Sequence, residues 1–311
     1  PELAVSVGAA WMGQPDLAVG NVVGSNIFNV LLILGLSAAI IPLAVAQQLV
    51  RIDVPLMIGA SVLLYAVSAD GQIGRWEGVL FSALGVGYVI LCMWLSKREA
   101  RAVKLEYAEA FVEDPAGNAA AGYVLQGAIA LFGLALLYLG AEWLVEGSVA
   151  LARAWGISEL VIGLTIVSAG TSMPEVATSV MAAIRGERDI AVGNVIGSNI
   201  FNILFVLGIS GIVAPKGVPV SVQAVEADMP IMIAVAFACF PVFFRGSIGR
   251  WEGAVFLAYY MAYVGYLIWH ATGHDMLPMF KEAMLLFVLP LTGLTLVVLM
   301  LQAHRRNRRP V

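Results

Sequence analysis

The sequence predicts an all-α integral membrane protein with two inverted-topology five-helix repeats, the first lacking its first helix, and one extra C-terminal helix. Three observations support this prediction. The chain is 60% hydrophobic and 12% charged, with a mean hydropathy of +0.90, whereas soluble domains carry about 25% charged residues. Apolar stretches long enough for a bilayer-spanning helix recur from one end to the other. Two long segments are near copies of each other.

Composition also narrows the classes of partner. The short alternating strands of a membrane β-barrel are absent from the sequence. A net charge of −4 gives no indication of a nucleic-acid partner. Cys92 and Cys239 fall inside predicted spans and suit apolar packing, and no Cys/His cluster resembles a metal or haem site. We therefore expect no cofactor and a lipid bilayer as surroundings. The oligomeric state is not determined by the sequence, with which a monomer is compatible.

Apolar runs and their breakers divide the chain into predicted helices. Their ranges are 1–13, 17–45, 53–69, 75–96, 123–154, 158–185, 190–214, 224–244, 250–271 and 279–302. Basic residues cluster in the connection 97–122 and in the C-terminal tail, and such clusters face the cytoplasm. The predicted units are 1–96 (first repeat), 97–122 (cytoplasmic linker), 123–272 (second repeat) and 273–311 (extra transmembrane helix and cytoplasmic basic tail). The expected location is the cell membrane, with multiple passes.

The internal duplication is the most informative feature of the chain. Residues 18–37 and 191–210 are identical at 15 of 20 positions, and IGRWEG at 73–78 recurs at 248–253. An odd number of helices per copy gives the copies opposite orientations, as in secondary transporters with ion sites near the membrane midplane. The second copy has five predicted helices and the first only four, so we expect roughly fifty further residues before Pro1.

The segment SAGTSMPE at 168–175 provides many oxygen atoms inside an apolar helix. Pro174 has no backbone N–H and is expected to free the carbonyl of Gly170, and of Thr171 as well. Oxygen-bearing side chains also recur at helical spacing along this segment: Ser168, Thr171, Ser172, Glu175 and Ser179. Ca²⁺ takes about 6–8 such oxygens at about 2.3–2.6 Å. The segment therefore predicts a site for a hard cation.

Glu175 is the central candidate, and Glu2 is its counterpart in the first copy. No Lys or Arg occurs in 154–184 of the Glu175 helix. An ionised side chain there costs at least ~2.5–3.5 kcal/mol unless it is compensated. Two carboxylates that meet near the centre repel each other unless a cation neutralises them. The competing interpretation is a buried glutamate satisfied by a hydroxyl group or a proton, and we favour function because intramembrane acids generally mark functional sites.

The second motif is GNVVGSNIFN at 20–29, with its copy GNVIGSNIFN at 193–202. Its oxygen-bearing side chains are expected to face the two acids, as follows: Ser25 and Asn29 opposite Glu2, and Ser198 and Asn202 opposite Glu175. Asn26 and Asn199 fit either ligation or helix packing. The glycines at positions 20, 24, 193 and 197 predict close helix contacts instead. The aspartates at positions 53 and 228 precede prolines and are predicted helix caps.

These motifs carry a resemblance to a known family. GTSMPE at 170–175 with GNVIGSNIFN at 193–202, and PE at 1–2 with GNVVGSNIFN at 20–29, resemble the paired α-repeats of the sodium/calcium exchanger family. More narrowly, the chain is similar to compact prokaryotic members of the cation/calcium exchanger superfamily, over most of 1–271. The resemblance implies four cation sites in a diamond, which Ca²⁺ and Na⁺ occupy in turn. It implies these ligands: Glu2, Glu175, Asn29, Ser25, Ser198, Thr171, Ser172 and Ser168, with backbone oxygen from Ser168 and Thr171.

One position departs from the family pattern. Asn202, a ligand candidate from its spacing, stands where potassium-dependent relatives carry Asp, which argues against K⁺ co-transport. The hypothesis is an antiporter that exchanges Na⁺ for Ca²⁺ by alternating access, with both ions as transported substrates. The alternatives are a Ca²⁺/H⁺ antiporter that uses the same glutamates and, less favoured, a cation channel. We do not expect an enzyme, because the sequence has no His-Glu-xx-His, Ser/Lys or paired-Asp motif with catalytic spacing.

Overall fold

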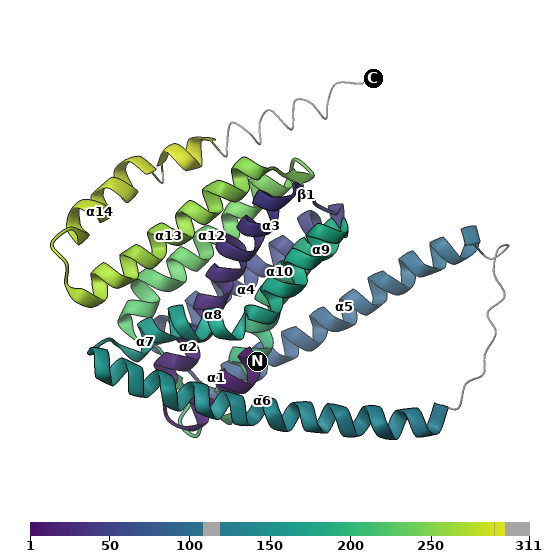
Figure 1. Ribbon diagram of the computed structural model, residues 1–311, viewed down its shortest axis with the longest axis horizontal. Helices are drawn as coiled ribbons and strands as arrows, with labels where there is room; N and C mark the ends of the chain where they lie inside the picture. Colours follow the sequence, from purple (N-terminus) through teal and green to yellow (C-terminus); the bar gives the residue numbers. More distant parts are fainter. Residues whose placement is uncertain (108–118, 289, 296–311) are drawn as a thin grey trace.

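The chain forms a bundle of membrane-length helices (Figure 1). The computed structural model describes residues 1–107, 119–288 and 290–295. Seven of its described helices are long and apolar enough to cross a membrane, or eight if one bent pair counts as a single span. The predicted class, a helical integral membrane protein, is therefore confirmed.

The second half begins with four additional elements and then repeats the order of the first half, without a counterpart of its 3₁₀ turn in the described structure. The first half contains α1 (Glu2–Trp11), α2 (Pro15–Phe28), η1 (Asn29–Leu34), α3 (Gly35–Ile40), β1 (Leu43–Ala44), η2 (Leu49–Asp53), α4 (Val54–Val67), η3 (Ser68–Asp70), β2 (Gln72–Ile73) and α5 (Arg75–Tyr107). The second half contains α6 (Ala119–Trp155), α7 (Glu159–Ile162), η4 (Gly163–Val167), α8 (Ser168–Thr171), α9 (Met173–Arg185), α10 (Arg188–Phe201), η5 (Asn202–Leu207), α11 (Gly208–Val213), β3 (Val218–Pro219), η6 (Ala224–Asp228), α12 (Met229–Phe243), β4 (Ser247–Ile248) and α13 (Arg250–Thr272). All η elements named here are π-helical except η3, a 3₁₀ turn.

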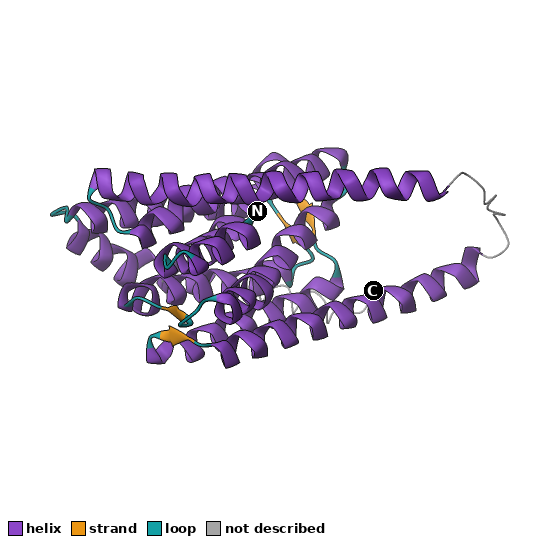
Figure 2. Ribbon diagram, turned by 90° about the horizontal axis from the view of Figure 1, so that it is seen from below, coloured by secondary structure: helices purple, strands orange, loops and turns teal. Residues whose placement is uncertain are grey.

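Two helices extend into the predicted linker. α5 continues to Tyr107 and α6 begins at Ala119, and both reach beyond the rest of the bundle (Figures 1 and 2). The remainder of the linker, 108–118, lies outside the described residues. The predicted extra helix is present as α14 (Leu277–Ala283) and the π-helical η7 (Met284–Val288). The tail from 296 onward also lies outside the described part.

The duplicated motif segments occupy the centre of the bundle. In the span 15–40, 78% of an 18-residue apolar stretch is buried inside the structure, and in its copy 188–213 the buried share is 67%. The corresponding shares for the spans that begin at Arg75 and Arg250 are 17%, so these helices present most of their surface outward. The central spans are therefore largely enclosed by the rest of the bundle.

Short strands join the two halves to each other. β1 pairs antiparallel with β4, and β2 pairs antiparallel with β3, so each two-stranded sheet takes one strand from each half. The Arg75 side chain donates to the carbonyl of Pro215 at 3.2 Å, and Arg250 donates to the carbonyl of Ile40 at the same distance. The halves are therefore linked by reciprocal polar contacts in addition to their helix packing.

The helix that carries Glu175 is broken, as its proline predicts. The pieces Glu159–Thr171 and Met173–Arg185 meet at a bend of 48°. Across the break, Ser172 N–H donates to the Ser168 carbonyl and Val176 N–H donates to the Ser172 carbonyl. Within the described residues, these bonds bypass the carbonyl of Gly170, because Pro174, four positions later, has no N–H to donate, and neither bond reaches the carbonyl of Thr171.

Candidate cation-binding site

A cavity of about 500 Å³ lies between the two halves beside this break. Four residues of the predicted ligand set line it: Glu2, Glu175, Ser198 and Asn202. No Lys or Arg is found among the described residues that line it. Both glutamates line the same cavity, where two like charges repel each other. The cavity is therefore an acidic space, lined by both oxygen-bearing and apolar residues, without a basic side chain to neutralise it.

A hydroxyl group from the opposite half donates to Glu2. The Ser172 Oγ donates to Glu2 Oε1 at 2.9 Å and lies 3.1 Å from Ser25 Oγ. Ser25 comes from α2, whereas Ser172 stands at the break between α8 and α9. All three side chains are buried. The fold thus brings three of the predicted ligand residues into one continuous series of polar side-chain contacts.

Two buried oxygen atoms of the predicted ligand set have no hydrogen-bond partner in the described structure. They are Glu175 Oε2 and Asn29 Oδ1. Buried acceptors are nearly always paired, so an unpaired one indicates a water molecule or an ion. Asn29 begins the π-helical turn η1, and its copy Asn202 begins η5. Single π-helical turns are frequent at functional sites, and sequence reasoning did not identify them.

Thr171 and Ser168 are buried but are not among the residues that line the cavity. The Thr171 hydroxyl donates to Asn21 Oδ1 at 3.0 Å, and the Asn21 amide donates to Ser6 Oγ at 2.9 Å. The Ser168 hydroxyl instead bonds to the Leu164 carbonyl of its own helix at 2.8 Å. The Ser168 side chain is therefore already satisfied, whereas Thr171 is oriented by an amide from the other half.

Asn21 is a member of the site that sequence reasoning missed. Its copy Asn194 repeats the contact by donating to Ser179 Oγ at 2.9 Å. Asn21 follows Ser6 at a separation of 15 residues, and Asn194 follows Ser179 at the same separation. This repeated spacing was the signal in the sequence that could have identified both pairs.

The predicted glycine contacts are confirmed in one half only. A Cβ on Gly20 would lie 2.7 Å from the Leu160 carbonyl oxygen, so the backbones of α2 and the α7–η4 segment are in close contact. Gly193 and Gly197 have no described atom within 4 Å of such a Cβ. They line the cavity instead. The prediction of close packing is therefore wrong for these two glycines within the described residues.

The predicted aspartate caps are also wrong. Asp53 and Asp228 make no side-chain cap hydrogen bond to their helices. Instead, Tyr88 donates to Asp53 at 3.1 Å and Tyr263 donates to Asp228 at 3.2 Å. A π-helical turn precedes each proline, so both aspartates have helical backbone angles, whereas a capping residue has an extended backbone.

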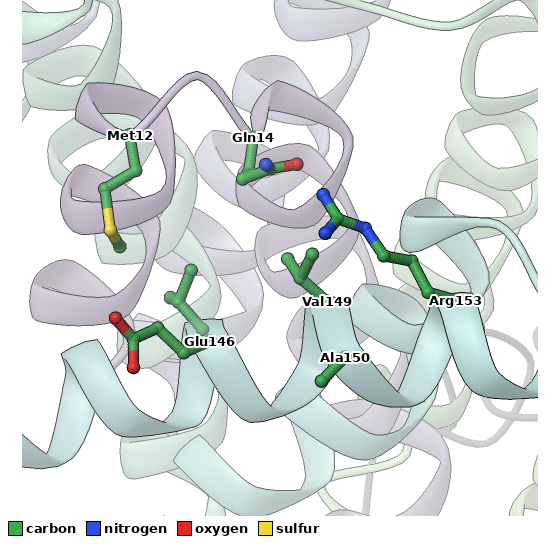
Figure 3. Close-up of a pocket in the computed structure, with 7 residues that line it drawn as sticks. Met12, Gln14, Glu146, Val149, Ala150 and Arg153 are labelled. Carbon is green, nitrogen blue, oxygen red and sulfur yellow. The ribbon is translucent and has the colours of Figure 1, made fainter.

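A second hollow, of about 340 Å³, lies between α6 and the turn that follows α1 (Figure 3). Glu146 and Arg153 project into it from α6, facing Met12 and Gln14 respectively. Glu146 is exposed. This hollow mixes both charge signs and does not resemble the acidic cavity.

The fold and the site together define a helical membrane protein with an oxygen-rich, acidic cavity between two related halves. Oxygen donors of this kind suit hard cations such as Na⁺ and Ca²⁺. Discontinuous helices at the interface of two repeats are typical of the ion sites of secondary transporters. This class is supported by comparison with known proteins.

The family model described as "Sodium/calcium exchanger protein" matches residues 1–94 and 126–269. The chain is 41% identical over 273 residues to "Putative antiporter CaxA" of Alkalimonas amylolytica, with 86% of this chain and 82% of that protein covered. It is 33% identical over 294 residues to "Sodium/calcium exchanger MaX1" of Methanosarcina acetivorans, with 85% and 83% covered.

Among solved structures, the chain resembles the sodium-calcium exchanger NCX_Mj soaked with Na⁺ and Ca²⁺. The TM-score is 0.61 at 29% identity, with 85% of this chain and 81% of that chain covered. The chain therefore belongs to the sodium/calcium exchanger family, a family of cation/calcium antiporters.

Proposed function

We propose that this protein exchanges Na⁺ for Ca²⁺ by alternating access, with the cations bound in the cavity between Glu2 and Glu175. The observation that carries this proposal is the pair of unpaired buried oxygens, Glu175 Oε2 and Asn29 Oδ1. One belongs to the first half and the other to the second. Neither the carboxylate oxygen nor the amide oxygen can donate, and coordination to a cation would satisfy such an acceptor.

The proposed ligand set is the one that the family resemblance implies, together with Asn202, the candidate from spacing. The carboxylates supply charge, and the neutral oxygens come from these residues: Ser25, Asn29, Thr171, Ser172, Ser198 and Asn202. For Ser168, the backbone oxygen that the resemblance implies is proposed, although it already accepts from Ser172 N–H, and the hydroxyl, which donates within its own helix, is left out. A site with two carboxylates and several neutral oxygens suits either one Ca²⁺ or several Na⁺ ions.

Exchange follows from the electrostatics of the two acids. Two carboxylates that share a poorly solvated cavity repel each other, and a bound cation removes that repulsion. The empty cavity therefore resists the passage between outward-open and inward-open states, whereas the loaded cavity permits it. This coupling makes the movement of one ion species depend on the return of the other.

The proposal is tested by Ca²⁺ flux in proteoliposomes under separate Na⁺ and pH gradients. We expect Ca²⁺ movement to follow an imposed Na⁺ gradient at constant pH. Ca²⁺ movement that follows only the pH gradient would instead establish the Ca²⁺/H⁺ alternative. That alternative is included because Asn202 lines the cavity with an amide at a position where some relatives, including potassium-dependent exchangers, carry Asp. Ca²⁺ flux without any counter-ion would indicate a channel.

The site assignment is tested with Glu175→Gln. The substitution preserves shape but removes one of the two charges, so we expect coupled Ca²⁺ flux to be abolished while thermal unfolding stays near that of the unmodified protein. Glu146→Gln is the matched control, because Glu146 is exposed and lines the other hollow. We expect unchanged flux for the control. Unchanged flux in Glu175→Gln would contradict the assignment.

We also propose the orientation that the basic clusters indicate, with the linker between α5 and α6 and the C-terminus on the cytoplasmic side. Cysteines placed at Ala108 and Ala303 would report it. Both are expected to react with a membrane-impermeant thiol reagent only when the cytoplasmic face is accessible. Reaction from the outside of intact cells would reverse the proposed topology.

A further inference from the structure

Four asparagines from the duplicated motif meet where the halves cross. Two are the proposed ligands Asn29 and Asn202, and two are the inner residues Asn26 and Asn199. All four are buried. Asn29 Nδ2 donates to Asn199 Oδ1 at 3.0 Å, and Asn202 Nδ2 donates to Asn26 Oδ1 at 3.2 Å. Each outer amide is thus held by the inner amide of the opposite half.

Backbone carbonyls determine how the inner amides are turned. Asn199 Nδ2 donates to the Asn26 carbonyl at 3.2 Å, and Asn26 Nδ2 donates to the Asn199 carbonyl at 3.4 Å. A carbonyl oxygen can only accept, so each inner amide must direct its nitrogen there. Its oxygen must then point the other way, toward the outer amide.

The remaining donor capacity of the inner amides is also used. Asn199 Nδ2 contacts Met57 Sδ, and Asn26 Nδ2 contacts Met232 Sδ, both at 3.6 Å. Thioether sulfur is a weak acceptor and cannot donate. Because Met57 lies in α4 and Met232 in α12, the same contacts join the asparagine cluster to the neighbouring helices. No alternative orientation of the inner amides satisfies these four acceptors.

The orientation of the inner amides determines the orientation of the outer amides. Asn29 must present its nitrogen to Asn199 Oδ1, so its own oxygen points away and is the buried atom without a partner. An amide turned the opposite way would direct N–H groups at the site and repel a cation. We propose that Asn26 and Asn199 are positioning residues, which hold the amides of Asn29 and Asn202 with their oxygens toward the transported cation. This inference depends on the proposed function for the identity of that cation.

The alternative explanation is that the inner asparagines act only as polar helix contacts, as amides often do in membrane proteins. The two explanations differ in a measurable way. A positioning residue changes cation affinity only through the ligand that it orients. A helix contact changes stability, and its effect on affinity does not depend on whether that ligand is present.

The test is a double-mutant cycle on Ca²⁺ binding to the purified full chain, measured by isothermal titration. The variants are Asn199→Leu, Asn29→Ala and the double variant. Loss of groups that orient metal ligands typically weakens affinity about 10–100-fold. We expect each single variant to weaken Ca²⁺ binding by about 10-fold or more. The double variant should bind no more weakly than Asn29→Ala, because Asn199 then has no ligand amide left to orient.

Three outcomes overturn the inference or its basis. Wild-type affinity in Asn199→Leu, or effects that multiply in the double variant, would refute the positioning role while leaving the cation site intact. Wild-type affinity in Asn29→Ala would remove Asn29 from the proposed ligand set, and the positioning role with it. If Asn199→Leu does not fold, the mirrored cycle with Asn26→Leu and Asn202→Ala provides the same comparison.

Ser61→Ala is the control for loss of a buried polar group nearby. Its hydroxyl bonds to the Met57 carbonyl within α4 at 2.8 Å, one turn from the methionine sulfur that contacts Asn199. We expect wild-type Ca²⁺ affinity in this variant. A loss as large as that of Asn199→Leu would show that any polar change in this region weakens binding, and would overturn the specific role of the inner amides.

Discussion

Gly24→Ala tests the close helix contact that places Ser25 beside Ser172. A Cβ at position 24 would lie 2.6 Å from the carbonyl oxygen of Leu164, 2.7 Å from its Cα and 2.8 Å from Ser168 Oγ. Two of these three atoms belong to the backbone of η4 and cannot rotate away. The helices α2 and η4 must therefore separate to accommodate a single methyl group.

The size of the effect follows from these distances. Ordinary contact begins at 3.4 Å, so a carbonyl at 2.6 Å requires a displacement of about 0.8 Å. Overpacking of this kind costs about 1–3 kcal/mol of stability. Oxygen ligands of Ca²⁺ lie within a range of only about 0.3 Å, from about 2.3 to about 2.6 Å. A displacement larger than that range should also weaken Ca²⁺ binding.

The assays are thermal unfolding in detergent and Ca²⁺ titration of the same preparation. Gly59→Ala is the control, because no described atom lies within 4 Å of a Cβ at this exposed position of α4. Without a clash, Ala is the better helix former by about 1 kcal/mol. The two substitutions should therefore change stability in opposite directions. If Gly24→Ala unfolds and binds Ca²⁺ as Gly59→Ala does, the close contact is not present.

Two further predictions concern individual hydroxyl groups. Tyr263→Phe removes the hydroxyl group that donates to the fully buried Asp228. Because this carboxylate then lacks a partner, we expect thermal unfolding to show a loss of stability of about 1–3 kcal/mol. An unchanged unfolding midpoint would mean that water replaces the phenol. Ser172→Ala removes the hydroxyl that donates to Glu2 and should weaken Ca²⁺ binding, whereas Ser168→Ala removes a hydroxyl that bonds only within its own helix and should leave binding nearly unchanged. Equal effects of the two serine substitutions on Ca²⁺ titration would contradict the different roles assigned to them.

Much of the architecture was predictable because it depends on local composition. Pro174 predicted the helix break, which occurs as a 48° bend directly before it. The duplicated motif predicted two related central spans, and these are the two most buried candidate spans among the described helices. Membrane helices are recognisable in this way because each must satisfy its own backbone and present apolar side chains along about 20 residues.

The wrong predictions concern residues whose partners are set by tertiary contacts and not by the local sequence pattern. Asp53 and Asp228 fit the pattern of a cap before a proline, yet each carboxylate accepts from a tyrosine 35 positions further along the chain. Gly193 shares its motif with Gly20, but only Gly20 meets a neighbouring backbone in the described structure. Identical short sequences therefore have different surroundings in the two halves.

Taken alone, the sequence determined the membrane class, the duplication and the two acids, since hydropathy, repetition and charge are properties of residues in order along the chain. The tertiary structure alone decided which hydroxyl reaches Glu2 and which way each amide points. Those features are contacts between residues about 170 positions apart. They depend on how each helix is rotated about its axis, and helical spacing restricts that rotation without specifying the partner.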